Sequence, residues 1–334
     1  MKSFTFATLA LAAVTRAQLL DLEDLAESVP APIAVTPPFG GNAEELTSTS
    51  NLRFAKRDVC ATQATGKGPA SNPPTAEGFL NDPDFEATAL GAGAPDGYFN
   101  TFKNLKGSIE GVGYKTLNTI DTYDPAICAR ACNVMDGCNA FNIMYERNGL
   151  TASGANCDKP LPTTIIKCTF WTVPVVAEHA TNIGNRANDQ PDNNQFGIVI
   201  AASNGYVSNK FKPISGYQGT TIPVDAALNA PTTTPNSFIR SQTFPISAEY
   251  KLTNCAKACS DQAAYEYRHP SPGGARACNF FNSYLLLKNG VAQSQVCSMY
   301  TQSFDNSYST NFGQQQNGNT YTITFGLSQS LISQ

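Results

Sequence analysis

The apolar positions of this chain fall into short runs that predict β-strands, and the runs occur in two sets. Most runs are rich in Phe, Tyr, Ile or Val, and the last run of the second set alternates apolar with polar positions. β-Branched and aromatic residues in such a pattern are typical of half-buried strands. The predicted strands are 138–142, 168–176 and 198–200 in the first set, and 278–286, 297–300 and 321–325 in the second.

A cysteine pair in a helix-favouring stretch precedes each set of strands. Asp124 is a good N-cap and is followed by proline, which suits the first helical position. Cys128 and Cys132 are four residues apart, so both sulfurs lie on one helical face, and Cys255 and Cys259 repeat this spacing. Each set therefore predicts one helix packed across an antiparallel sheet, and the fold class is α+β.

Seven sequence blocks recur in the same order, which makes the chain a tandem repeat. The pattern places a first domain at 97–204 and a second at 205–334, with almost no linker between them. We expect a restricted relative orientation for domains joined in this way. Three of the matched blocks are Gly97-Tyr98 with Gly205-Tyr206, Cys138-Asn-Ala-Phe-Asn142 with Cys278-Asn-Phe-Phe-Asn282, and 196–203 with 321–328.

The N-terminus has the composition of a secretory signal peptide. Lys2 supplies a positive charge, and the apolar run at 4–14 is too short to span a bilayer. Residues 1–17 are therefore predicted to be removed by cleavage after Ala17. Secretion agrees with the ten cysteines, because disulfides persist in oxidising compartments. We expect a secreted protein that is extracellular or associated with a cell wall.

The next segment, 18–57, is acidic, then proline-rich, then rich in Ser and Thr, and it contains no cysteine. Such a composition predicts disorder. It ends at Lys56-Arg57, a dibasic pair of the kind that secretory processing proteases cut, so we interpret it as a propeptide removed after Arg57. The alternative is a flexible tail that stays attached. Residues 58–96, rich in Gly, Pro, Ala and Ser, are expected to form an irregular arm.

The overall composition excludes some classes of partner. Charged residues are only 14% of the chain and the net charge is −4, without a Lys/Arg cluster, so we expect no nucleic-acid partner. No stretch after the signal is long and apolar enough to predict a membrane span. The polar surface must come from Asn, Gln, Ser and Thr, which suit hydrogen-bonding partners such as glycans.

The cysteines of each repeat limit how the disulfides can form. Four cysteines allow three pairings. The two helical cysteines both face the sheet, which disfavours pairing them with each other and leaves two alternatives. Cys60 and Cys157 have no counterpart in the second repeat, so we pair them with each other, which ties the N-terminal arm to the first domain.

The cysteine framework resembles that of the PAN/apple domain: a helix with Cys-x3-Cys, then Cys-x-x-Phe, then a cysteine followed by apolar or aromatic residues. The tandem copy, with Lys56-Arg57 and Tyr123-Asp-Pro-Ala-Ile-Cys-Ala-Arg-Ala-Cys132, resembles secreted fungal proteins with apple-like domains. The resemblance covers about residues 97–334 and departs from the family by lacking a disulfide between the domain termini. It implies the pairings that we favour: Cys128–Cys168, Cys132–Cys138, Cys255–Cys297 and Cys259–Cys278.

The resemblance implies protein or carbohydrate binding and no shared catalytic residues, and the side chains also argue against an enzyme. His179 and His269 lie at non-equivalent points of the repeats, where we expect surface or loop positions. All ten cysteines are assigned to disulfides, so we expect no metal and no cofactor. The carboxylates Asp121, Asp124 and Glu146 have no consistent counterparts in the second repeat, which makes a glycoside hydrolase the less favoured alternative.

Aromatic and amide side chains are the candidate ligand-binding residues, because stacking faces beside amides suit sugars. Trp171 and Tyr300 each follow the last cysteine of a repeat, although an aromatic residue beside a disulfide is commonly part of a core. The insertion at 261–274 is expected to be a long exposed loop. Our leading hypothesis is a non-catalytic protein that binds carbohydrate or protein at a cell wall or extracellular surface, and the alternative is a structural wall or matrix protein. The remaining candidates are Asn139, Asn279, Tyr265, Tyr267 and Arg268.

Overall fold

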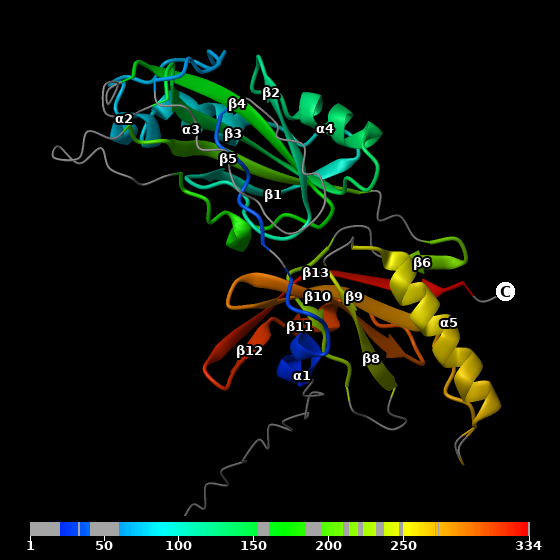
Figure 1. Cartoon of the computed structure of the whole chain (residues 1–334). Helices are drawn as coiled ribbons and strands as arrows, with labels where there is room; N and C mark the ends of the chain where they lie inside the picture. Colours follow the sequence, from blue (N-terminus) through cyan, green and yellow to red (C-terminus); the bar gives the residue numbers. More distant parts are fainter. Residues whose placement is uncertain are drawn as a thin grey trace, which may run out of the picture.

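The structure is a computed structural model in which two repeats, each an antiparallel sheet with helix on one face, are stacked on each other (Figure 1). This confirms the α+β class and the antiparallel sheets expected from the sequence. The predicted signal peptide 1–17 with Ala17, and the processing residue Arg57, lie outside the described residues. The structure describes residues 21–32, 34–40, 60–152, 160–184, 196–209, 214–219, 223–231, 237–246, 250–270, 272 and 274–332.

Repeat 1 contains a five-stranded sheet, sheet 1, with the strand order β1-β5-β3-β4-β2. All of its pairings are antiparallel. The cysteine-bearing helix begins where predicted, since Asp124 accepts a hydrogen bond from the backbone N–H of Ala126. The elements are β1 (Tyr98–Leu105), β2 (Tyr114–Ile120), α4 (Pro125–Val134), β3 (Ala140–Gly149), β4 (Pro162–Trp171), η1 (Ala177–His179) and β5 (Val199–Ser208).

Repeat 2 contains the corresponding sheet, sheet 2, with the order β12-β13-β9-β10-β8 and with β6 also paired to β13. A small second sheet joins β11 to β7. The elements are β6 (Tyr217–Gly219), β7 (Ala227–Leu228), β8 (Phe238–Pro245), α5 (Leu252–Arg268), β9 (Phe280–Lys288), β10 (Val291–Tyr300), η2 (Asn306–Tyr308), β11 (Ser309–Asn311), β12 (Gly313–Gln316) and β13 (Asn319–Leu331).

The boundary between the repeats lies after Ser208, so the predicted boundary at 204/205 is wrong because it cuts through β5. The counterpart of Gly97-Tyr98 is Gly216-Tyr217, and the predicted match with Gly205-Tyr206 is also wrong. Gly97 and Gly216 both have positive φ, 81° and 87°. Each following tyrosine donates a 3.5 Å hydrogen bond to a carbonyl of the cysteine-bearing helix of its own repeat.

The last strands match in a register two residues away from the predicted one. Ala202 in β5 and Phe325 in β13 both have positive φ, 53° and 57°, and both lie where the pairing with the central strand shifts. They are therefore equivalent, whereas the predicted alignment matched residue 200 with Phe325. A shift of two residues keeps every side chain on the same face of the sheet, so the apolar pattern alone did not expose it.

Four disulfides tie the helices to the sheets, two to strands and two to the segments just before β3 and β9. They are the pairs favoured above: Cys128–Cys168, Cys132–Cys138, Cys255–Cys297 and Cys259–Cys278. All four helical cysteines are fully buried against the sheets. Cys60 is disulfide-bonded, and its predicted partner Cys157 lies outside the described residues.

The predicted irregular arm, 58–96, contains two short helices that belong to the core of repeat 1. They are α2 (Ala76–Leu80), capped by Thr75, and α3 (Pro83–Gly91), capped by Asp82. Phe79 and Phe85 are 1% and 2% exposed and pack with Tyr145 on the same face of sheet 1 as α4. That face, the helix face, is therefore covered by three helices in repeat 1.

The helix face of repeat 2 is covered by α5 and by repeat 1 itself. One apolar cluster contains buried residues of both repeats, among them Trp171 and Tyr250. Phe99 of repeat 1 stacks on Phe325 of repeat 2 with ring centroids 6.0 Å apart, and the Asn139 side chain donates to the Tyr250 carbonyl. This continuous core agrees with the restricted orientation expected from the short connection.

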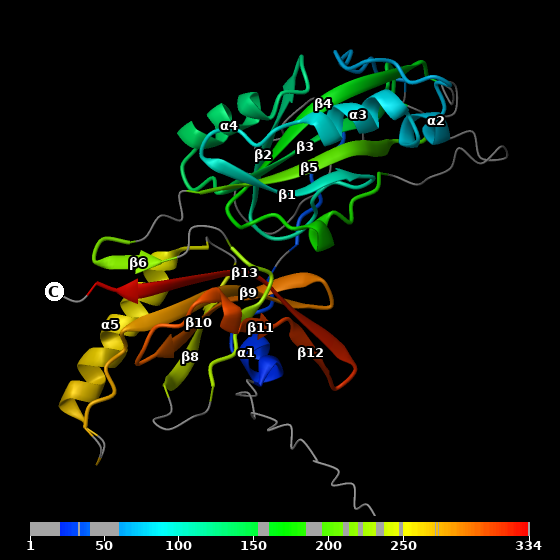
Figure 2. The ribbon, with the colours of Figure 1, turned by 180° about the vertical axis from the view of Figure 1, so that it is seen from behind.

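The predicted disorder of 18–57 is wrong for residues 21–32 and 34–40, which we call the N-terminal strap. It begins with the helix α1 (Leu22–Glu27), which lies on repeat 2, and then runs to repeat 1 (Figures 1 and 2). Leu22 and Ala26 are 1% and 3% exposed. The composition misled because the strap has no core of its own and instead packs on apolar surface supplied by the repeats.

Candidate functional site

Two of the predicted ligand-binding residues are core residues. Trp171 is fully buried, donates from Nε1 to Thr169 Oγ1 over 3.0 Å, and packs edge-on against Tyr114. Tyr300 is 1% exposed, lies among Phe238, Phe280 and Phe304, and donates to a backbone carbonyl. Neither ring is accessible to a ligand, so the alternative interpretation, core packing beside a disulfide, is the correct one for both.

The amides Asn139 and Asn279 are equivalent but lie apart from one another. Asn139 is half-buried, and its Nδ2 donates to Thr172 O over 2.7 Å at the contact between the repeats. Asn279 is exposed and its Nδ2 donates to Thr301 O over 3.1 Å. Each amide thus donates to the backbone carbonyl that directly follows β4 or β10. Of the two amides, only Asn279 is exposed.

The other three candidates gather at the end of α5, and their predicted loop is wrong because the helix continues through it to Arg268. Tyr265 and Tyr267 are 52% and 72% exposed, and Arg268 is exposed beside them. The ring of Tyr265 stacks on His269 with centroids 4.5 Å apart. This half of α5 projects past the edge of sheet 2 (Figure 1). Tyr265 and Arg268 are three residues apart and lie on one side of the helix, whereas Tyr267 lies on the other side.

Among the described residues, His179, Glu146 and Asp124 each have a separate structural role. His179, expected at the surface, is 6% exposed, and burial lowers its pKa to about 4, so it is neutral near pH 7. Glu146 is also buried, in an ion pair with Lys167, and Asp124 serves as the cap of α4. A cavity of about 560 Å³ lies between α3 and the start of α4, and Asp124 is among the described residues that line it.

Within the described ranges, no group of three or more His, Cys, Asp or Glu side chains is placed to hold a metal ion. None of the helices among these residues has the length and apolar character that a membrane crossing requires.

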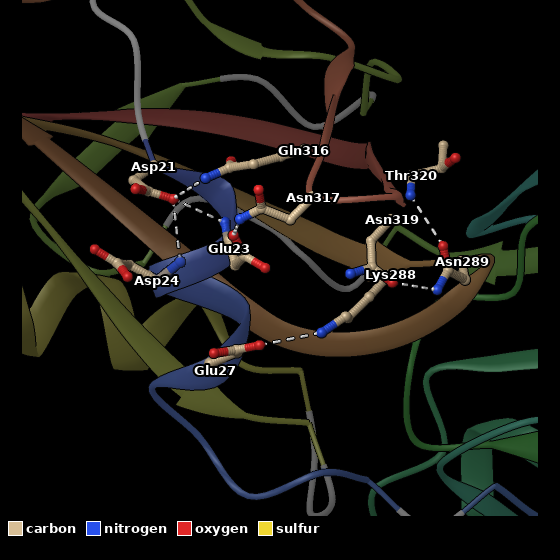
Figure 3. A network of polar contacts seen from close by, with 10 residues as sticks. All are labelled: Asp21, Glu23, Asp24, Glu27, Lys288, Asn289, Gln316, Asn317, Asn319 and Thr320. Atoms are coloured by element: carbon tan, nitrogen blue, oxygen red, sulfur yellow. Dashed lines mark hydrogen bonds and ion pairs between the residues drawn. The ribbon is translucent and has the colours of Figure 1, made fainter.

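The strap takes part in a polar network on an exposed surface, and its helix lies over the face of sheet 2 opposite α5, the outer face. Leu22 and Ala26 of α1 cover an apolar floor. Along one side of α1 the polar network links its acidic side chains to Lys288 of β9 and to the turn between β12 and β13 (Figure 3). The floor consists of Ala227, Tyr284, Leu286, Val296, Tyr321 and Ile323, each no more than 1% exposed.

Polar side chains at the rim of this floor hold the acidic side chains of α1. The carboxylate of Asp21 caps the helix and accepts from Gln316 Nε2 over 3.0 Å, which lowers the pKa of Asp21. Asn317 Nδ2 donates to Glu23 Oε2. Lys288 Nζ lies 3.2 Å from Glu27 Oε1, and this contact raises the pKa of Lys288.

On repeat 1 the strap makes backbone contacts to a polar outer face. Glu146 Oε2 and Lys167 Nζ form an ion pair of 2.5 Å. The strap completes it, since Gly40 N–H donates to Glu146 Oε1 over 2.7 Å and Lys167 donates to the Pro38 carbonyl over 2.8 Å. Val35 also exchanges two backbone hydrogen bonds with Gly111. The strap therefore contacts both repeats over most of its length.

Sequence reasoning missed this surface, although a local pattern pointed to it. Asp21 is a good N-cap, and Leu22, Leu25 and Ala26 follow with the i, i+3, i+4 spacing of an apolar helix face. The pattern spans fewer than two turns and lies in a proline-rich, acidic segment, so composition outweighed it.

No family model matches this chain, and comparisons with curated proteins and with solved structures find no similar protein.

Proposed function

We propose that the chain is a secreted, non-catalytic binding protein with tandem PAN/apple-like repeats, which recognises carbohydrate or protein at a cell wall or another extracellular surface. The observation that carries the proposal is the projecting end of α5, where Tyr265 and Tyr267 are exposed beside Arg268. Rigid aromatic faces next to polar donors are suited to stacking and hydrogen bonding with sugars, and equally with polar protein surfaces.

The helical form of this surface supports the proposal. The Cys259–Cys278 disulfide fixes the middle of α5 to the repeat. Hydrogen bonds between side chains four residues apart, Lys257–Asp261 and Gln262–Glu266, also stabilise the helix. A preorganised helix loses less conformational entropy on binding than a flexible loop of the same composition.

The test is a pull-down of the intact chain with insoluble cell-wall polysaccharides, beside a disulfide-reduced sample. Tyr265→Ala/Tyr267→Ala should weaken binding about tenfold or more, because each lost aromatic contact is worth about 0.5–1.5 kcal/mol. The matched control is Phe312→Ala, since Phe312 is also an exposed aromatic of repeat 2, at 66%, but lies outside α5.

A polysaccharide bound equally by the double variant and the wild type would contradict α5 as the contact surface. A chain that binds no polysaccharide would remove the carbohydrate version of the proposal and leave a protein ligand, which the same variants test by cross-linking on intact cells.

A further inference from the structure

We infer that the outer face of sheet 2 is a binding groove for a short acidic amphipathic helix, which α1 fills within the same chain. Cleavage after the Lys56-Arg57 pair would open the groove to other segments of this kind. The inference goes beyond the proposed function and uses none of the α5 residues, so the two fail independently.

The floor of the groove accounts for the apolar part of the ligand. Tyr284, Leu286 and Ile323 are buried on the face of sheet 2 that α5 does not cover, in one apolar cluster with Leu22 and Ala26 of α1. A sheet face of this size with aromatic and branched side chains requires an apolar cover. The cover needs two apolar side chains one helical turn apart, as Leu22 and Ala26 are.

The helical shape of the ligand is imposed by the groove. α1 has only six residues, far fewer than the roughly 12–15 that an isolated helix needs in water. Its conformation therefore depends on docking, and a free segment would fold as it binds. This is the helix-in-groove mode of peptide recognition, in which apolar residues spaced by three and four anchor the helix.

The rim selects acidic segments. Gln316 and Asn317 offer amide donors to Asp21 and Glu23, and Lys288 offers a cation to Glu27. These contacts are solvent-exposed and individually weak, so they favour an acidic ligand over a basic one and leave most of the affinity to the floor.

The connection between α1 and the repeats keeps the groove filled in the intact chain. A segment tethered to its own site binds at an effective concentration of about millimolar, which competing ligands must exceed. A cut after residue 57 removes this advantage, because the strap then dissociates and rebinds as a separate peptide. Occupancy by another acidic helix thus depends on whether the tether is intact.

The experiment measures fluorescence anisotropy of a labelled synthetic peptide of residues 18–32. Its receptors are the intact chain and the intact chain carrying Leu22→Asp/Ala26→Asp, a variant that undocks α1 and leaves the Pro38 and Gly40 contacts in place. The peptide should bind the variant saturably and the wild type at least tenfold more weakly. A peptide with the same two substitutions should lose at least tenfold, and a Glu27→Lys peptide two- to fivefold.

Equal binding of the wild-type and doubly substituted peptides overturns the inference, and so does absence of saturable binding to a variant whose Trp171 fluorescence matches the wild type. If the variant does not fold, the wild-type chain cut after Arg57 replaces it as the receptor. Exchange of labelled peptide into the folded, cut chain supports the groove, and failure to exchange overturns it.

Discussion

The outer faces of the two repeats share one framework but differ in chemistry. Asn142 and Asn282 occupy the same buried position and make the same bonds, accepting from a backbone N–H and donating to the last strand. On the same face, repeat 1 has the ion pair Glu146–Lys167. The equivalent positions of repeat 2 are Leu286 and Val296, and Val296 pairs with Tyr284 of β9.

The difference explains why one strap takes two forms. Over the charged pair it has no regular secondary structure, and its N–H and C=O groups at Gly40 and Pro38 satisfy the two side chains. Over the apolar pair it is helical, which ties up its backbone groups internally and presents only side chains to the floor. The chemistry of each sheet face thus dictates the secondary structure of the segment that covers it.

The helix faces differ in how far each repeat depends on its neighbour. In repeat 1, α2, α3 and α4 cover the sheet. In repeat 2, α5 is joined by side chains of repeat 1, with Phe99 stacked on Phe325. Repeat 2 therefore relies on repeat 1 for part of its core, while the helix face of repeat 1 is completed by its own segments.

The largest expected effect comes from breaking the charged pair of repeat 1. Lys167→Met leaves the Glu146 carboxylate buried without its cation, and such a loss costs about 3–5 kcal/mol of unfolding free energy. Urea denaturation followed by the fluorescence of Trp171, the only tryptophan, measures it within repeat 1.

The control gives repeat 1 the residues that repeat 2 has at the equivalent positions. Glu146→Leu/Lys167→Val removes both charges, and its cost should be clearly smaller than that of Lys167→Met, since a charge pair and an apolar pair of similar volume are often close in stability. A double variant as unstable as the single one would mean that the strap contacts at Gly40 and Pro38, and not the unpaired charge, dominate the loss.

The second effect depends on pH and distinguishes the two 3-10 helices. His179 ends η1 and is buried, whereas the equivalent Tyr308 ends η2 and is 38% exposed. The folded-state pKa of His179, about 4, lies below the ordinary value of 6.5, so the neutral form contributes stability that is full above pH 6.5 and is lost as the pH falls toward 4. The loss at pH 4 is about 3 kcal/mol.

His179→Phe should abolish this component. Its urea midpoint should fall less than that of the wild type between pH 7 and pH 4, while Tyr308→Phe should follow the wild type. Carboxylate protonation affects all three proteins alike, so the difference between them isolates the histidine. Parallel pH profiles for the wild type and His179→Phe would mean that His179 does not oppose protonation.

The helix that carries a cysteine pair could be predicted from the sequence because it depends on local spacing. Cys128 and Cys132 mark one face of a helix by their four-residue separation, and the Asp124 cap fixes where that helix begins. The recurrence of Asn142 as Asn282 likewise revealed equivalent strands before any structural role was known. These features determine the α+β class and the antiparallel sheets.

The remaining features depend on contacts between distant segments, which spacing does not reveal. Trp171 and Tyr300 follow cysteines in the same way whether the ring points to solvent or to a core. The helices α1 and α2 have six and five residues, too few to be stable without the sheets on which they pack. Of the aromatic residues predicted as candidates, only Tyr265 and Tyr267 of α5 are exposed.

The smallest expected effect compares the equivalent short disulfides. Cys132–Cys138 spans 6 residues and Cys259–Cys278 spans 19, because repeat 2 inserts the second half of α5. In the chain-entropy model, removing them by double alanine substitution costs about 2 and about 3 kcal/mol, respectively. The expected difference is about 1 kcal/mol in urea denaturation followed by circular dichroism.

The long disulfides provide the control, since Cys128–Cys168 and Cys255–Cys297 span 40 and 42 residues and should cost the same, about 4 kcal/mol each. A larger loss in repeat 2 for the long pair as well would show that repeat 2 is weaker for another reason, its dependence on repeat 1 for part of its core. Equal losses for the short pair would show that loop length does not set the difference between the repeats.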